Sequence, residues 1–307
     1  MFVKLKETIE KYDLLNLITT NSACQLMPVN ANKLIRLEAM AFCICSCQYD
    51  SNNPVMSKSR IKSIYNTNLY GLEKLAIYED PFEQMYTESI TFYGGTYTVF
   101  PGITETGTLI IKHLLKAIFL SERNPEFRQF YKKAYEVALF FLNISNALAE
   151  NAGLKYGEES KVIDTDIRIP PFDLEEKLLN AVLFDKKDLT EILKRSGIEI
   201  GIIDNFVVNF GDVVINNYTQ DNHILHHKPF LQHDDKIVVA MPCNLLGTLR
   251  HSLINFAIEY GFINELKSKF EDELWATTVK SLNMMNINTY SENDTVYRFI
   301  NDETLID

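Results

Sequence analysis

The chain has little of the glycine that phosphate-binding loops need, and it lacks the short motifs of common enzyme classes. It has 12 glycines in 307 residues, and neither GxxxxGK[S/T] nor GxGxxG occurs. This excludes the usual P-loop and the dinucleotide-binding loop. The GxSxG motif of serine hydrolases and the protein-kinase motifs are missing too. These absences favour a non-catalytic protein over an enzyme of these classes.

Cysteines and long apolar runs are scarce as well. The five cysteines form an odd set, and the first residues, MFVKLKETIEKYD, contain no apolar signal core, so a disulfide framework is not expected. The longest apolar run, residues 109–120, carries two lysines and is too short to cross a bilayer. We therefore expect a cytoplasmic protein that makes no membrane contact.

The chain has no excess of positive charge in either half, and its second half is acidic. Residues 1–150 hold 15 basic and 15 acidic residues, whereas residues 151–307 hold 15 basic and 26 acidic residues. The net charge of −11 therefore comes from the second half. Because binding along a nucleic-acid backbone needs clustered Lys and Arg, broad nucleic-acid binding by the acidic half is not expected.

Apolar residues make up 46% of the chain and follow helical spacing over most of its length. The pattern predicts an α+β fold that is mainly α-helical, with a small antiparallel β-hairpin in each half. The first hairpin, ITFYGGTYTVF (90–100), would turn at Gly94-Gly95, because glycine readily takes the positive φ angles of a tight turn. The second would turn at 233–235. Further strands are expected at 213–215 and in the C-terminal tail, and helices at 3–18, 31–48, 58–66, 105–121, 124–153, 173–183, 188–196, 243–260 and 264–285.

A change of composition after residue 153 predicts two domains. Residues 154–172 contain the polar stretch GEES, an extended segment and the pair Pro170-Pro171, which is typical of a linker. We expect a helical domain with the aromatic hairpin at 1–153 and an acidic α+β domain at 173–307.

The first hairpin is rich in aromatic side chains. Phe92, Tyr93, Tyr97 and Phe100 form a candidate surface for a protein partner, because aromatic residues are enriched in the cores of interfaces. Packing of the same rings in the protein core is the alternative interpretation.

Four of the six histidines lie close together, in HILHHKPFLQHDD (223–235). The candidate metal ligands in this segment are His223, His226, His227, His233, Asp234 and Asp235. The spacing of the first three suits metal ligands, although on a strand the middle one would point away from the other two. An exposed hairpin end with solvated imidazoles is the favoured interpretation, and a metal site is the alternative.

Two segments resemble parts of known proteins. They are EDPFEQMYTESITFYGGTYTVFPG (79–102) and HHKPFLQHDDKIVVAMPCNLLGTLRHSLINFAIEYG (226–261). Both resemble the helical N-terminal region of large multidomain bacterial proteins of uncertain function, some with a restriction-endonuclease-like nuclease domain further on. The resemblance implies a non-catalytic region and identifies no functional residues. The ending, NDETLID, looks like half of a β element, so we expect a piece of a longer protein.

These observations favour a non-catalytic scaffold or protein-interaction region of a larger bacterial protein or complex, working without a cofactor. Its expected partner is another protein or further domains of the same protein. A metal-dependent hydrolase or nuclease that uses the 223–235 segment is one alternative. A nucleic-acid-binding module in the charge-balanced first half is the other.

Overall fold

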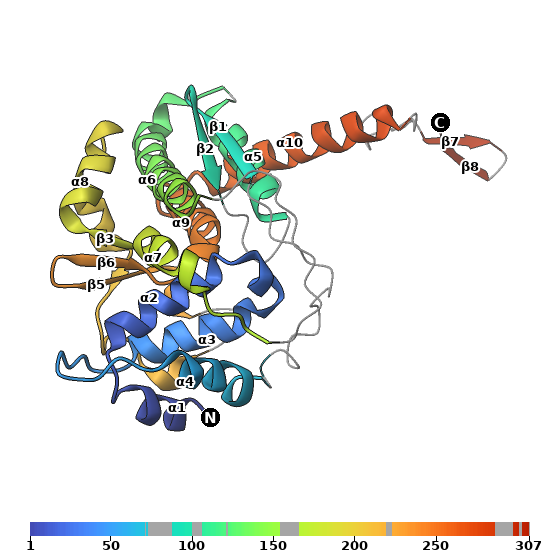
Figure 1. Ribbon diagram of the computed structural model, residues 1–307. Coiled ribbons are helices and arrows are strands. Elements are labelled where there is room, and N and C mark those ends of the chain that lie inside the picture. The colour runs from blue at the N-terminus through green and yellow to red at the C-terminus, as the bar shows by residue number, and fades with distance from the viewer. Residues whose placement is uncertain are drawn as a thin grey trace.

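The computed structural model describes residues 1–70, 72, 88–99, 106–120, 122–153, 166–218, 223–285, 297–300 and 303–306. Helices dominate and the strands are short, which confirms the α+β fold with an antiparallel hairpin in each half (Figure 1). The α-helices are α1 (Phe2–Ile9), α2 (Leu14–Gln25), α3 (Leu34–Cys45), α4 (Lys58–Ser63), α5 (Thr106–Phe119), α6 (Arg128–Ala152), α7 (Phe172–Val182), α8 (Lys186–Arg195), α9 (Leu245–Glu259) and α10 (Ile263–Met284). The strands are β1 (Glu88–Phe92), β2 (Gly95–Val99), β3 (Leu183–Asp185), β4 (Val207–Val208), β5 (Phe230–His233), β6 (Lys236–Val239), β7 (Tyr297–Ile300) and β8 (Glu303–Ile306). Short 3₁₀ or π turns are η1 (Pro28–Lys33), η2 (Ile64–Asn68), η4 (Pro125–Phe127), η5 (Ile200–Asn205), η6 (Ile215–Asn217), η7 (Ile224–His226) and η8 (Pro242–Asn244).

The single helix predicted at 3–18 is wrong, because the chain forms two helices there. Asp13 separates α1 from α2: its backbone is extended, and its carboxylate accepts hydrogen bonds from the N–H groups of Leu15 and Asn16 at 3.0 and 3.1 Å. An aspartate in this position satisfies the free N–H groups at a helix start, so it begins a new helix. α2 then lies in the interior, whereas α1 buries only Leu5 and Ile9.

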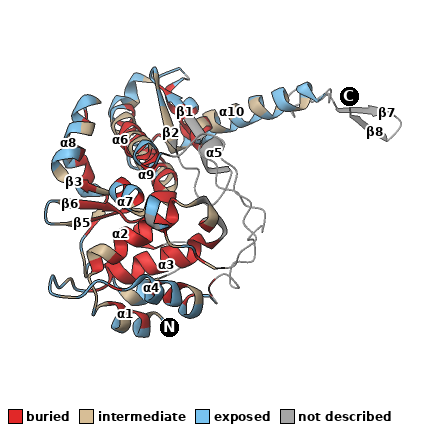
Figure 2. Cartoon of the chain, viewed as in Figure 1, coloured by how far each residue is buried: buried red, intermediate tan, exposed pale blue. Residues whose placement is uncertain are grey.

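The helix pair α2 and α3 lies at the centre of the molecule (Figure 2). Every residue of α3 is buried, as its nearly continuous apolar sequence predicts. On another side, α2 contacts α7 and β6 from the second half of the chain. Two charged residues of α3, Arg36 and Glu38, are buried with the rest. Since burying a charge costs free energy unless it is compensated, both positions need partners.

A four-stranded sheet contacts α2 through β6, and its strand order is β3-β6-β5-β4. β5 and β6 form the second predicted hairpin, with Asp234-Asp235 as its turn. The prediction of a strand at 213–215 is wrong, because these residues form a bend and the start of η6. The strand in this region is β4, which pairs in parallel with β5.

One hydrophobic core joins the two halves of the chain. Its buried residues run from Leu5 to Leu266 and come from both sides of the predicted linker. α6 packs on α7 and α9 as well as on β2. The division into domains at 1–153 and 173–307 stays a prediction, and residues 154–165 of the predicted linker lie outside the described residues.

α10 extends away from the body of the molecule. It packs on α5 and α9, and its C-terminal half runs outward, with the antiparallel pair β7 and β8 beyond its end (Figure 1). It buries Leu266, whereas Trp275, the single tryptophan of the chain, is 45% exposed. Among the helices described above, none has the length and apolar content needed to cross a membrane.

Candidate functional site

The first hairpin turns one residue earlier than its two glycines predict. Phe92 pairs with Gly95, so the turn residues are Tyr93 and Gly94, with φ angles of 46° and 82°. Two positive φ angles are the geometry of a type I′ turn. Gly95 belongs to the strand instead, where a Cβ would lie 2.8 Å from the hydroxyl of Tyr97. The prediction of a Gly94-Gly95 turn is therefore wrong, because Gly95 pairs with Phe92 and belongs to β2.

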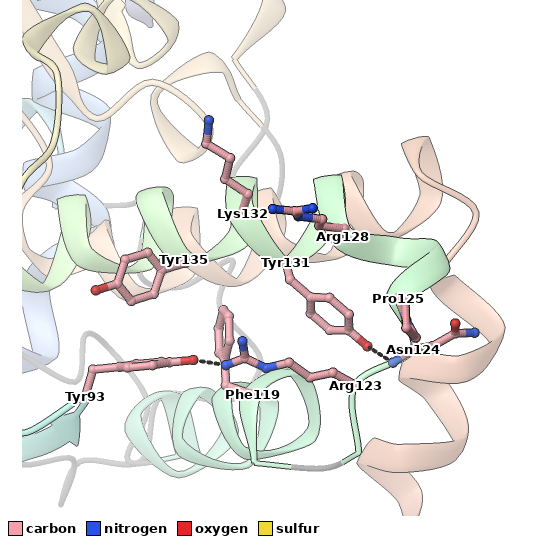
Figure 3. Close-up of a pocket in the computed structure, with 9 residues that line it drawn as sticks. All are labelled: Tyr93, Phe119, Arg123, Asn124, Pro125, Arg128, Tyr131, Lys132 and Tyr135. Carbon is pink, nitrogen blue, oxygen red and sulfur yellow. Dashed lines mark hydrogen bonds between the residues drawn. The ribbon is translucent and has the colours of Figure 1, made fainter.

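A tyrosine with positive φ is strained, and ring contacts hold Tyr93 in this conformation. Its ring centroid lies 4.9 Å from those of Phe92 and Tyr135 and 5.9 Å from that of Phe119. The Arg123 guanidinium donates a hydrogen bond to its hydroxyl (Figure 3). Tyr93 is nevertheless 55% exposed, so the strained turn presents an aromatic ring at the surface.

Tyr93 forms one wall of a pocket of about 430 Å³, which lies between the hairpin, the end of α5 and the start of α6 (Figure 3). We name it the tyrosine pocket, and its lining residues are Tyr93, Phe119, Arg123, Asn124, Pro125, Arg128, Tyr131, Lys132 and Tyr135. The guanidinium carbon of Arg123 lies 5.8 to 5.9 Å from the centroids of three of these rings. The hydroxyl of Tyr131 accepts a hydrogen bond from the backbone N–H of Asn124 at 3.3 Å, which fixes the loop beside Arg123.

A second pocket, of about 510 Å³, shares Tyr93, Phe119 and Arg123 with the first. We name it the apolar pocket, and its other lining residues are Ile90, Thr91, Phe92, Lys112, Leu115, Lys116 and Leu120. Lys116 is paired with Glu273 of α10 at 3.6 Å. Tyr93 and Arg123 therefore line both pockets. The tyrosine pocket is cationic and aromatic, and the apolar pocket is mainly apolar.

The tyrosine pocket is positively charged although the chain is acidic overall. Its lining includes Arg123, Arg128 and Lys132 and contains no Asp, Glu, His or Cys. Among the described residues, Lys132 pairs with Glu136 at a long 3.9 Å, and Arg128 has no ion pair. Tyrosine faces stack on flat rings, and guanidinium groups bind phosphate oxygens in a bidentate manner. The arrangement suits a ligand that combines an aromatic ring with phosphate.

The four aromatic residues predicted as a partner surface take different positions. Phe92 is buried among other rings, and Tyr97 is half-buried against the core, where burial and, to a smaller extent, Tyr135 raise its pKa. Phe100 lies outside the described residues. Tyr93 is the one of the three described rings that lines both pockets.

The sequence prediction missed the contribution of α6 to this site. Tyr131 and Tyr135 are four residues apart on this helix, and so are Arg128 and Lys132. Residues at this spacing lie on the same face of a helix. The spacing of these four residues could therefore have predicted a helix face with tyrosines beside cationic residues. No local pattern predicts that Tyr93 and Arg123 contact this face.

The predicted histidines also divide among several places. His223 is 3% exposed, directly before η7, and is therefore not a solvated imidazole at a hairpin end. His227 lies beside His251, with ring centroids 5.3 Å apart. His233, in β5, packs its ring 4.0 Å from that of Tyr49, and its Nε2 lies 3.6 Å from Asp234 at the hairpin turn.

The structure brings two of the predicted ligands, His223 and His226, together with Glu38 of α3. One donor atom from each of the three lies within 4.8 Å of the others, and we name this group the Glu38 cluster. Burial, with the charges of His226 and His227 as smaller causes, lowers the pKa of His223 to about 3. His223 is therefore neutral near pH 7. Asp235 is not part of this group, and the sequence prediction had not included Glu38.

The sequence model of the Upx-like anti-phage protein family matches residues 5–286. Neither a curated protein nor a solved structure matches the chain. The resemblance to N-terminal regions of larger nuclease-containing proteins stays a prediction. The match spans the tyrosine pocket, the Glu38 cluster and nearly all of the hydrophobic core, and on this ground the chain belongs to the Upx-like anti-phage protein family.

Proposed function

We propose that this chain contributes to defence against phage as a binding protein, with single-stranded nucleic acid as its ligand and the tyrosine pocket as its binding site. The role in defence follows from the family to which the chain belongs. The ligand is inferred from the composition and shape of the pocket.

The observation that carries the proposal is three cationic and three tyrosine side chains around one pocket without an acidic group. Proteins that bind single strands combine aromatic rings, on which bases stack, with cationic groups that contact phosphates. Stacking contributes about 1–3 kcal/mol per base. In the tyrosine pocket, Tyr93 and Tyr135 would stack on a base, while Arg123 and Arg128 would contact the phosphates beside it.

Size and charge favour a single strand over a duplex. A volume of about 430 Å³ accommodates one or two flat rings with their sugar and phosphate. Duplex binding needs a long cationic surface, whereas this chain carries a net charge of −11. A local cationic hollow in an acidic protein therefore fits an exposed, unpaired nucleotide.

The test is fluorescence anisotropy with labelled 15-nucleotide DNA and RNA at roughly 50 mM salt. We expect wild-type binding that weakens with added salt, and roughly tenfold weaker binding by Arg128→Ala, because a hydrogen bond to a charged group contributes about 1.5–3 kcal/mol. Arg195→Ala is the matched control, since Arg195 is an exposed arginine on α8 that does not line the pocket. Absence of binding by the wild-type protein, or equal losses in both variants, would contradict the proposal.

A protein partner is the second candidate, and the apolar pocket favours it. Leu120 lines this pocket and is 76% exposed, and Ile90 and Leu115 line it too. An exposed apolar hollow of this kind suits a side chain from a partner or from a further domain. Leu120→Ser should then reduce protection in a plaque assay while oligonucleotide affinity stays unchanged. Full protection by this variant would remove the second candidate.

A further inference from the structure

The Glu38 cluster joins a central helix to a segment that is distant in the sequence. Glu38 lies in α3 and is 4% exposed, whereas His223 directly precedes η7 and His226 is its last residue. Glu38 Oε2 and His226 Nε2 are 3.8 Å apart, and the two imidazole centroids are 4.0 Å apart. Three metal-ligating side chains therefore converge on one point in the protein interior.

His223 has polar atoms that no described residue satisfies. Both of its ring nitrogens are buried and have no hydrogen-bond partner. A buried polar atom without a partner costs about 1–3 kcal/mol, so such atoms are rare in folded proteins. The Glu38–His226 distance of 3.8 Å is also too long for a hydrogen bond. A cation would accept the lone pair of one His223 nitrogen and balance the Glu38 carboxylate.

We propose that Glu38, His223 and His226 bind one divalent transition-metal ion of the zinc type. Two imidazole nitrogens and one carboxylate oxygen form a ligand set that zinc accepts, with a fourth position left for water. Donor atoms around a tetrahedral zinc ion are about 3.3 Å apart, so the donors, now within 4.8 Å of one another, need to close by up to about 1.5 Å.

The surroundings hold the backbone of His226 and the ring of His223. The carbonyl oxygen of His226 accepts hydrogen bonds from Thr248 Oγ1 at 2.8 Å and Asn244 Nδ2 at 3.4 Å, which anchors η7 to the start of α9. The ring of His223 packs against those of Phe42 and Tyr218, at centroid distances of 5.3 and 5.4 Å, and these two rings also contact each other at 5.1 Å. Ligands held by their neighbours in this way lose little freedom when a metal binds.

A metal here would link the 223–227 segment to the central helix pair. Its role would be to stabilise the fold, because Glu38 and His223 are buried and the three ligands bridge two segments about 185 residues apart in the chain. Cys243 is also buried, but its Sγ donates to the carbonyl oxygen of Gln25 at 3.2 Å and it is not among the three converging donors. The ligand set is therefore nitrogen and oxygen without sulfur.

The first test uses the intact wild-type protein. After dialysis against EDTA and then metal-free buffer, it is titrated with Co²⁺, and bound Co²⁺ is displaced with Zn²⁺. We expect one ion per chain and visible bands of four- or five-coordinate Co²⁺ without an intense near-ultraviolet sulfur band. No binding at one ion per chain would overturn the proposal, and so would a sulfur band, which would show cysteine ligands.

The second test locates the site. Glu38→Gln and His226→Ala should each weaken Zn²⁺ binding by roughly 100-fold or more, because loss of even an outer partner of a ligand costs about 10–100-fold. His233→Ala is the matched control, since its ring packs on Tyr49 outside the cluster. Equal binding by wild type, Glu38→Gln and His226→Ala would overturn the assignment, and so would loss of binding in His233→Ala alone. Circular dichroism of each variant checks that it is folded.

Discussion

The tyrosine pocket and the Glu38 cluster each bring together residues from separate segments, but they differ in exposure and charge. The pocket is open and aromatic, and it holds three cationic side chains without an acid. The Glu38 cluster is largely buried, and it places one carboxylate beside two imidazoles. One site suits an anion with a flat ring, and the other suits a small cation.

The difference shows how burial decides what a site can bind. In an open pocket the charged side chains keep part of their hydration, so the site can stay empty at little cost. In the Glu38 cluster the ring nitrogens of His223 are buried away from water and have no partner, so they cost free energy until something fills the site. Variants of one site should therefore leave the ligand of the other unaffected.

The largest expected effect tests this independence directly. Arg123→Ala combined with Arg128→Ala should weaken oligonucleotide binding about 100-fold, or about 2.7 kcal/mol, because two charged contacts are removed. Zn²⁺ binding by the same double variant should stay unchanged. Glu38→Gln should show the reverse pattern in the same two assays. Loss of both ligands in either variant would show that the two sites are coupled.

The next effect is the contribution of His223, in the Glu38 cluster, to the pH dependence of stability. Burial holds the pKa of His223 near 3, whereas an unfolded histidine has a pKa of about 6.5. Between these values the unfolded chain binds a proton that the folded chain does not, so stability is complete above pH 6.5 and falls as the pH is lowered. At pH 5 the loss in the free energy of unfolding is about 2 kcal/mol.

The measurement is urea unfolding in EDTA at pH 7.5 and pH 5, for wild type and His223→Gln. Glutamine carries no proton in this range, so the variant should lose about 2 kcal/mol less than wild type. His227 and His251, whose pKa values are also lowered by burial first, are present in both proteins and cancel. The same pH dependence in both would contradict a buried neutral His223.

A smaller effect concerns the strain in the hairpin beside the tyrosine pocket. Gly94 has a φ of 82° and an added Cβ would meet nothing within 4 Å, so Gly94→Ala changes only backbone strain. We expect a loss of about 1 kcal/mol in the free energy of unfolding and weaker oligonucleotide binding. Gly201→Ala is the matched control, because its Cβ also meets nothing and its φ is ordinary. Equal thermal shifts for the two variants would argue against strain at the turn.

The smallest effect separates the ring of Tyr93 from its hydroxyl. Tyr93→Phe keeps the stacking face and removes the hydrogen bond from Arg123, so binding should weaken only about threefold. Tyr93→Leu removes the aromatic face and should weaken binding by roughly tenfold. If both variants bind equally well, the ring does not stack on a base.

Local patterns in the sequence predicted much of the fold. The apolar sequence of α3 predicted a fully buried helix, and aromatic and β-branched runs predicted both hairpins. The single helix at 3–18 failed because Asp13 caps a new helix, a local signal that helical periodicity hides. The turn at Tyr93-Gly94 follows from the pairing of Phe92 with Gly95, a register that the two glycines alone do not specify.

The two sites were predicted less well than the fold. His223 and His226 were identified from their spacing, but their third partner, Glu38, lies in a helix whose other residues indicate only a core. The parallel pairing of β4 with β5 was missed for the same reason, because it depends on a contact between segments that are distant in the sequence. Periodicity reports which face of an element is buried, and it does not report which distant segment covers that face.

The course of α10 also decides how unfolding of this protein can be observed. Trp275 is the single tryptophan, and it lies half-exposed on the helix that leaves the body. Its fluorescence should therefore emit near the wavelength of a hydrated indole and change little when the core melts. The rings stacked in the core, such as Phe140 with Phe206, contribute to near-ultraviolet circular dichroism. That signal follows the core, whereas a blue shift of Trp275 would report only that something had covered α10.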